Sequence, residues 1–136
     1  MICVDRIFLV DMWRTKDLFD SPVRDFLVTH SADEFVVPVH AAGAFLECCA
    51  SISATRLKQA ESILGFFRIG CFDFDTARRY AAMVSALRRG STLGKRSKTD
   101  LWIAAWAIQH SATLVTRDKI HFRDIPDLRL ASYLSL

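Results

Sequence analysis

The sequence predicts an α/β fold in which a mainly parallel sheet carries helices on both faces. Short apolar strands alternate with helical segments along the chain, as in parallel sheets built from crossover connections. No polar side chain occurs from Leu101 to Ile108, and a helix that is apolar on every side has to lie inside a layered structure. The β-branched run Thr113–Thr116 follows it, which is typical of an interior parallel strand.

Apolar spacing and helix-capping residues predict the other elements of the first half. Ser21 and Pro22 form an N-cap and N1 pair, so a helix is expected to start there. The elements predicted are the strand Ile2–Val4 with the apolar segment Ile7–Trp13 continuing out of it, the helix Pro22–His30, the strand Phe35–Val39 and the helix Ala41–Ala50.

The second half continues the alternation of strands and helices, which gives a sheet of four to five strands in total.

Trp102 and Trp106 lie four residues apart on the apolar helix, and both are expected in the core. The further elements predicted are a helix with Leu57, Ala60, Ile63, Leu64 and Phe67 on one face and its end at Gly70, the strand Cys71–Phe72, a helix capped by Asp73 or Asp75 that runs to Gly90, and an edge strand Leu128–Leu130.

Length and composition narrow the class of protein. A chain of 136 residues, of which 51% are hydrophobic, is expected to form one domain over residues 1–136 with a large core. No apolar run reaches the ~18 residues of a membrane span, and the N-terminus does not resemble a signal peptide, so we expect a cytoplasmic protein. The glycines form neither GxGxxG nor a P-loop, which disfavours a dinucleotide or NTP enzyme.

Three acidic residues stand at the ends of predicted elements. Asp5 follows the first strand, Asp100 opens the apolar helix, and Asp118 follows the strand after it. Ligands of open α/β sheets bind at the carboxyl ends of the strands, so we expect the three carboxylates to meet at one edge. Mg²⁺ and Mn²⁺ prefer oxygen ligands, and these acids are therefore candidate ligands of a divalent ion. Alternatively, Asp100 caps its helix and Asp118 forms a turn.

Basic residues surround two of these acids, although the net charge is only +3. They could hold a nucleic-acid backbone beside a metal ion. The alternative is a solvated loop that keeps the protein in solution. The candidate nucleic-acid-binding residues are Lys95, Arg96, Lys98, Arg117 and Lys119.

The C-terminal third contains several short motifs in a fixed order. They are Leu93-Gly94, Thr99-Asp100-Leu101, Ala112–Asp118, His121-Phe122 and Ile125-Pro126. Together they closely resemble the PIN domain of VapC-type toxins, and Val4-Asp5 resembles the first strand of that family. The resemblance implies a three-layer α/β/α fold and an Mg²⁺- or Mn²⁺-dependent ribonuclease. It further implies Asp5, Asp100 and Asp118 as catalytic and metal-binding acids, a homodimer and a small antitoxin partner.

The chain departs from the family pattern at the expected site. After the first acid the family usually has Thr, where this chain has Arg6. The family's second acid, a Glu, is expected to fall at Gly43, and Glu47 stands about 6 Å further along the helix axis. Arg6 can pair with nearby carboxylates and occupy the place of the metal.

Two functions therefore remain open. The first is a metal-dependent endoribonuclease of toxin-antitoxin type that hydrolyses RNA phosphodiester bonds, weakened by the absence of an acid at Gly43. The second is a catalytically inactive PIN domain that acts as a dimerising or antitoxin-binding module.

Overall fold

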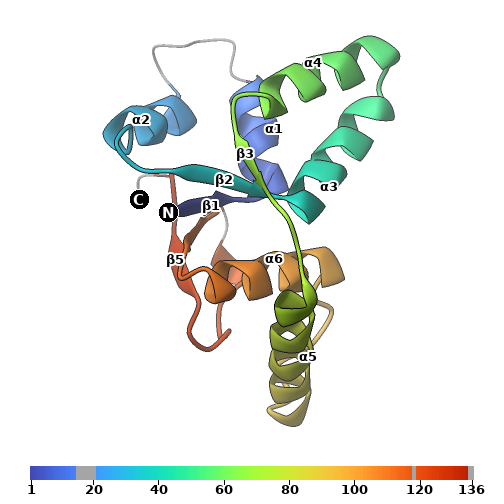
Figure 1. The fold of residues 1–136 in the computed structure, drawn as a ribbon, viewed down its shortest axis with the longest axis vertical. Helices are drawn as coiled ribbons and strands as arrows, with labels where there is room; N and C mark the ends of the chain where they lie inside the picture. Colours follow the sequence, from blue (N-terminus) through green and yellow to red (C-terminus); the bar gives the residue numbers. More distant parts are fainter. Residues whose placement is uncertain (15–20, 118, 135–136) are drawn as a thin grey trace.

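The fold is built on one parallel sheet. The computed structural model describes residues 1–14, 21–117 and 119–134. Within these ranges the strands are β1 (Ile2–Val4), β2 (Phe35–Pro38), β3 (Arg68–Gly70), β4 (Thr113–Val115) and β5 (Arg129–Ala131). They are all parallel and lie in the order β3-β2-β1-β4-β5 (Figure 1). The predicted parallel α/β sheet is confirmed.

Helices cover both faces of this sheet. Those of the described residues are α1 (Arg6–Arg14), α2 (Pro22–Thr29), α3 (Val39–Ala50), α4 (Ala54–Leu64), α5 (Phe74–Arg89), α6 (Lys98–Gln109) and the 3-10 turn η1 (Lys119–His121). Figure 1 shows α1 to α4 on one side of the sheet and α5 and α6 on the other. The expected three layers are therefore present. None of these helices has both the length and the apolar character needed to cross a membrane.

The central strand β1 marks the point where the chain reverses its direction across the sheet. From β1 the chain proceeds to β2 and β3 on one side, and then returns to β4 and β5 on the other. Val4 pairs in register with Val115 of β4, so the residues that follow the two strands emerge side by side. In open α/β sheets such a switch point opens a crevice at the carboxyl ends of the strands.

Helix α1 starts directly after β1, where the sequence predicted that the apolar segment Ile7–Trp13 continues out of the strand. The carboxylate of Asp5 accepts a hydrogen bond from the backbone N–H of Phe8, with 2.9 Å between Oδ1 and N. This contact caps the helix at its N-terminus. Helical spacing then buries Phe8 and Leu9 completely in the core.

The third strand lies earlier in the chain than predicted. Helix α4 ends at Leu64 with Gly65 as its C-cap, and β3 occupies Arg68–Gly70 rather than Cys71–Phe72. Phe67 had extended the apolar spacing of the helix, but the helix ends before it, and the neighbouring Phe66 is 89% exposed. Pairing of Pro38 with Gly70 places the strand beside β2.

Close packing of α6 on the sheet explains the glycine at the end of β3. The Trp106 side chain is fully buried, and its indole N–H donates to the carbonyl of Cys71 at 3.1 Å. A Cβ at Gly70 would lie only 2.4 Å from the Trp106 ring. Trp106 is thus in the core as predicted, whereas Trp102 is only partly buried.

Candidate metal and phosphate site

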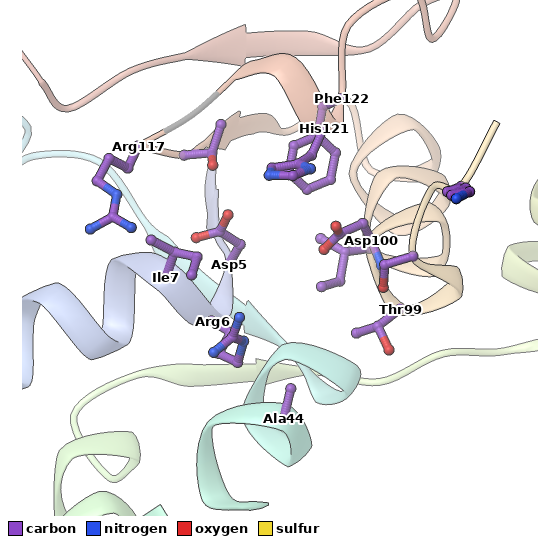
Figure 2. A pocket seen from close by; sticks show the side chains of 13 residues that line it. Asp5, Arg6, Ile7, Ala44, Thr99, Asp100, Arg117, His121 and Phe122 are labelled. Atoms are coloured by element: carbon purple, nitrogen blue, oxygen red, sulfur yellow. The ribbon is translucent and has the colours of Figure 1, made fainter. Parts of the chain in front are cut away.

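A cavity of about 420 Å³ lies at the switch point of the sheet (Figure 2). Its walls come from four parts of the chain that are distant in sequence: the start of α1, helix α3, the start of α6 with the loop before it, and the segment after β4. Figure 2 shows the carboxylates of Asp5 and Asp100 facing the same space, with His121 above them and Arg6 below. The structure therefore brings two of the three predicted acids together.

Asp5 is held rigidly at the bottom of the cavity. Its side chain is buried and accepts hydrogen bonds from the N–H of Phe8 and from the side chain of Thr116. Burial raises the pKa of Asp5, and the negative charge of Asp100 raises it further, while the two hydrogen bonds and the charge of Arg6 lower it. A carboxylate in this setting lacks full compensation for its charge.

Asp100 enters the cavity from the first turn of α6. The helix begins at Lys98 with Ser97 as its N-cap, whose hydroxyl accepts from the N–H of Asp100 at 3.4 Å. The prediction that Asp100 itself opens the helix was wrong, and its carboxylate is therefore not needed as a cap. Burial raises the pKa of Asp100, while the charges of His121 and Arg6 lower it.

The third predicted acid, Asp118, lies outside the residues that the structure describes. In the described ranges, no group of three or more Asp, Glu, His or Cys side chains could hold a metal ion. Mg²⁺ is commonly bound by one or two carboxylates together with water and substrate phosphates. Two partly desolvated carboxylates that face one cavity, Asp5 and Asp100, fit a hard divalent cation of this kind.

Ala44 of α3, not Gly43, lines the cavity. Gly43 is exposed, and a Cβ added there would have no neighbour within 4 Å. Gly43 and Ala44 point about 100° apart on the helix, so a side chain at Ala44, and not one at Gly43, reaches the cavity. Glu47 is exposed and does not line the cavity, so the structure gives no support to the idea that it replaces the missing acid.

The predicted basic residues have different surroundings. Lys95 and Arg117 line the cavity, as does Arg6, whose side chain is exposed. Lys98 and Lys119 are exposed and lie outside the cavity wall.

Arg96 is a structural residue in this arrangement. Its guanidinium donates to the backbone carbonyls of Thr92, His121 and Arg123 at 3.1, 3.0 and 2.7 Å. It thereby fastens the loop before α6 to the segment after β4. The N–H groups of Arg96 that donate to these three carbonyls are the donors that it would need to bind a phosphate.

Three contacts at the cavity or near it were not predicted. Arg117 donates to the carboxylate of Asp11 at 3.1 Å, and the buried Tyr133 hydroxyl donates to the same carboxylate. Thr116 bonds Asp5, a contact that follows from the pairing of Val4 with Val115. Sequence alone gives the strands but not their order, so it could not place these residues side by side.

Comparison with solved structures shows that the fold is shared over nearly the whole chain. A chain of VapBC2 from Rickettsia felis, bound to a DNA fragment from their promoter, has 20% identity and a TM-score of 0.82, with 97% of this chain and 98% of that chain covered. A chain of FitAcB from Neisseria gonorrhoeae has 23% identity and a TM-score of 0.81, with 98% of each chain covered.

A chain of FitAB bound to an IR36 DNA fragment has 26% identity and a TM-score of 0.83, with 100% of this chain and 97% of that chain covered. Among curated proteins, none matches the chain. A sequence model of the PIN domain matches residues 2–128. This match covers most of the sequence and agrees with the fold and with the paired acids, so the chain belongs to the PIN domain family.

Proposed function

We propose that the protein is a metal-dependent endoribonuclease of toxin-antitoxin type. The observation that carries this proposal is the shared cavity of Asp5 and Asp100, in which burial raises the pKa of both carboxylates. Membership of the PIN domain family and the similarity to chains of VapBC and FitAB complexes support it. RNA is the proposed substrate, and Mg²⁺ or Mn²⁺ the proposed cofactor.

Asp5 and Asp100 are the residues that would hold the ion. A divalent cation bound there lowers the pKa of a coordinated water and stabilises negative charge on a phosphate. The N–H of Phe8 and the side chain of Thr116 keep the Asp5 carboxylate in a fixed orientation. Preorganised ligands of this kind need no rearrangement when charge develops.

Lys95 and Arg117 are the residues that would hold the RNA backbone. Both line the cavity that the acids face. The Asp11 carboxylate orients the Arg117 guanidinium, which leaves part of the fork for a phosphate. Asp118, outside the described residues, remains a proposed third ligand.

We expect the activity to be weak, because Ala44 has no carboxylate. Its methyl group lines the cavity where a longer acidic side chain would face Asp5 and Asp100. With fewer carboxylates, affinity for the cation falls, and the charge of Arg6 reduces it further. We therefore expect slow cleavage that needs a high concentration of metal.

The second candidate is an inactive PIN domain that binds an antitoxin and forms dimers. A separate cavity of about 550 Å³ favours a protein-binding role, because its lining is mostly apolar and includes the highly exposed Phe66. Exposed apolar surface of this kind marks interaction sites. The other apolar residues that line it are Met12, Leu27, Phe35, Ile63 and Phe67.

Cleavage of a labelled single-stranded RNA with Mn²⁺ separates these candidates. We expect slow cleavage by the wild type, and a loss of at least ~100-fold in Asp100→Asn, since even partners of metal ligands contribute 10- to 100-fold. Asp25→Asn is the matched control, because Asp25 is an exposed acid in the first turn of α2. Equal rates in wild type and Asp100→Asn would exclude this site as the nuclease, and no cleavage by the wild type would favour the inactive module.

A further inference from the structure

Four aromatic side chains form a stack that the proposed chemistry does not use. His40 lies on Phe72 with 4.3 Å between ring centroids and 10° between ring planes, and Tyr80 lies on Trp102 with 4.0 Å and 5°. Trp102 joins the two pairs, because it contacts Phe72 at 5.9 Å and 24° and His40 at 5.6 Å and 31°. The stack therefore connects α3, the segment before α5, α5 itself and α6.

This arrangement differs from the packing of aromatic rings inside the protein. Phe8 contacts Phe26 and Tyr133 edge to face, at 78° and 86°, as aromatic core residues often do. In the stack, by contrast, the planes of contacting rings differ by only 5° to 31°, and His40, which contacts both Phe72 and Trp102, is exposed. An exposed ring held by other aromatic rings can accept a further flat ring.

The stack lies beside the cavity of the two acids. His40 precedes Ala44 by four residues on α3, and Trp102 follows Thr99 by three residues on α6. Ala44 and Thr99 both line the cavity. Residues three or four apart on a helix are neighbours about 5–6 Å apart between Cβ atoms. Both helices thus carry the rings within about one turn of the cavity wall.

We propose that this stack, with His40 as its accessible ring, binds a base of single-stranded RNA next to the phosphate that enters the cavity. The inference rests on the proposed function, because it assigns the flanking nucleotide of the same substrate. Bases stack on aromatic side chains largely without regard to sequence, whereas Lys95 and Arg117 contact only the backbone. The stack thus selects unpaired RNA over duplex RNA, whose bases are already stacked.

Binding without divalent metal tests this proposal separately from cleavage. The probes are a fluorescein-labelled single-stranded RNA of about ten nucleotides and an abasic ribose-phosphate strand of the same length, both in EDTA. Fluorescence anisotropy is measured for wild type, His40→Ala and His40→Tyr. His30→Ala is the matched control, since His30 also lies near a phenylalanine ring, that of Phe26, at 4.2 Å, but at the C-cap of α2 and outside the cavity lining.

We expect His40→Ala to bind the RNA about tenfold more weakly, as loss of one base-stacking contact predicts, and to bind the abasic strand like the wild type. His40→Tyr should retain the affinity, because the ring is kept, and His30→Ala should change neither value. Unchanged RNA affinity in His40→Ala, or an equal loss for both probes, would overturn the proposal. So would a change of oligomeric state in His40→Ala, measured by light scattering, because the rings would then pack against a second copy.

Failure of this proposal and failure of the nuclease proposal give different results. If RNA is cleaved at the two acids but binding does not depend on bases, the stack has no role in substrate recognition and the nuclease remains. If binding depends on bases and on His40 but no cleavage occurs, the stack is confirmed and the nuclease is excluded.

Discussion

Asp5 and Asp100 line one cavity, where burial raises the pKa of Asp5 and the charge of Asp100 raises it further. These residues come from opposite ends of the sequence, and the order of the strands brings them together. Two buried like charges destabilise each other unless a cation or a proton lies near them. Arg6 and His121 offset part of this repulsion, and a bound cation would offset more of it, as expected of a binding site.

Asp100→Asn should stabilise the protein at neutral pH. The folded-state pKa of Asp100 lies above its ordinary value of 3.8, so the folded protein binds more protons than the unfolded chain between these two values. Stability consequently falls as the pH rises through this interval, and the loss is complete above it. Asn carries no charge, so the variant should unfold at a higher temperature than wild type at pH 7. Thermal unfolding without metal checks this, and a difference that persists below about pH 3 would contradict it.

Ala44→Glu should strengthen metal binding and cleavage, because Ala44 lines the cavity. One added carboxylate ligand is expected to raise the apparent affinity for Mn²⁺ at least ~10-fold, because removing a residue that supports a metal ligand lowers metal affinity by a similar factor. Gly43→Glu is the matched control, since it adds the same charge one residue away, where the surroundings are open. Cleavage rates as a function of Mn²⁺ concentration measure both variants. An equal gain in the two would show that general negative charge, and not the position, is responsible.

Gly70→Ala should destabilise the fold by ~1–3 kcal/mol, the usual cost of overpacking. The new Cβ would lie 2.4 Å from the buried Trp106 ring, which has no room to move away. Gly43→Ala provides the opposite case, because Gly43 lies in α3 with free space around it. There we expect a gain of ~1 kcal/mol from helix propensity. Urea unfolding gives both values, and a neutral Gly70→Ala would refute the close packing of α6 on β3.

Arg96→Ala and Lys95→Ala should have different effects although the residues are adjacent. Arg96 donates to three backbone carbonyls, so its loss should lower the free energy of unfolding by ~1 kcal/mol. Lys95 lines the cavity, and we expect Lys95→Ala to weaken RNA binding while stability stays within ±0.5 kcal/mol. Unfolding and anisotropy measurements on both variants check this. The reverse pattern would restore Arg96 as a phosphate-binding residue.

Most elements of the fold could be predicted from local patterns. The apolar runs predicted β1, β2 and β4, and Ser21 with Pro22 predicted the start of α2. Errors occurred where one pattern fits two structures. Phe67 continues a helical spacing, but the helix ends at Leu64 because β3 pairs with β2. Tertiary pairing decided the outcome there, and no local signal contains it.

The acids of the site could be predicted from the sequence, but the residues around them could not. Asp5 was found because it follows a strand of a parallel sheet, whereas Asp100 was found at the start of the apolar helix and through the family resemblance. Deciding which residue of α3 faces the cavity requires knowing where this helix starts. It starts at Val39, two residues before the predicted start. Without that register, Gly43 and Ala44 cannot be distinguished. Likewise, a run of basic residues does not reveal that Arg96 binds carbonyl groups.

Isothermal titration with Mn²⁺ tests the central claim most directly, namely that Asp5 and Asp100 share one divalent cation. The titration compares wild type with Asp5→Asn, Asp100→Asn and the exposed control Asp25→Asn. We predict one binding event in wild type and in Asp25→Asn, with the affinity reduced at least ~10-fold in each of the other two. Binding of equal strength in all four proteins would contradict the claim, and so would the absence of binding in wild type.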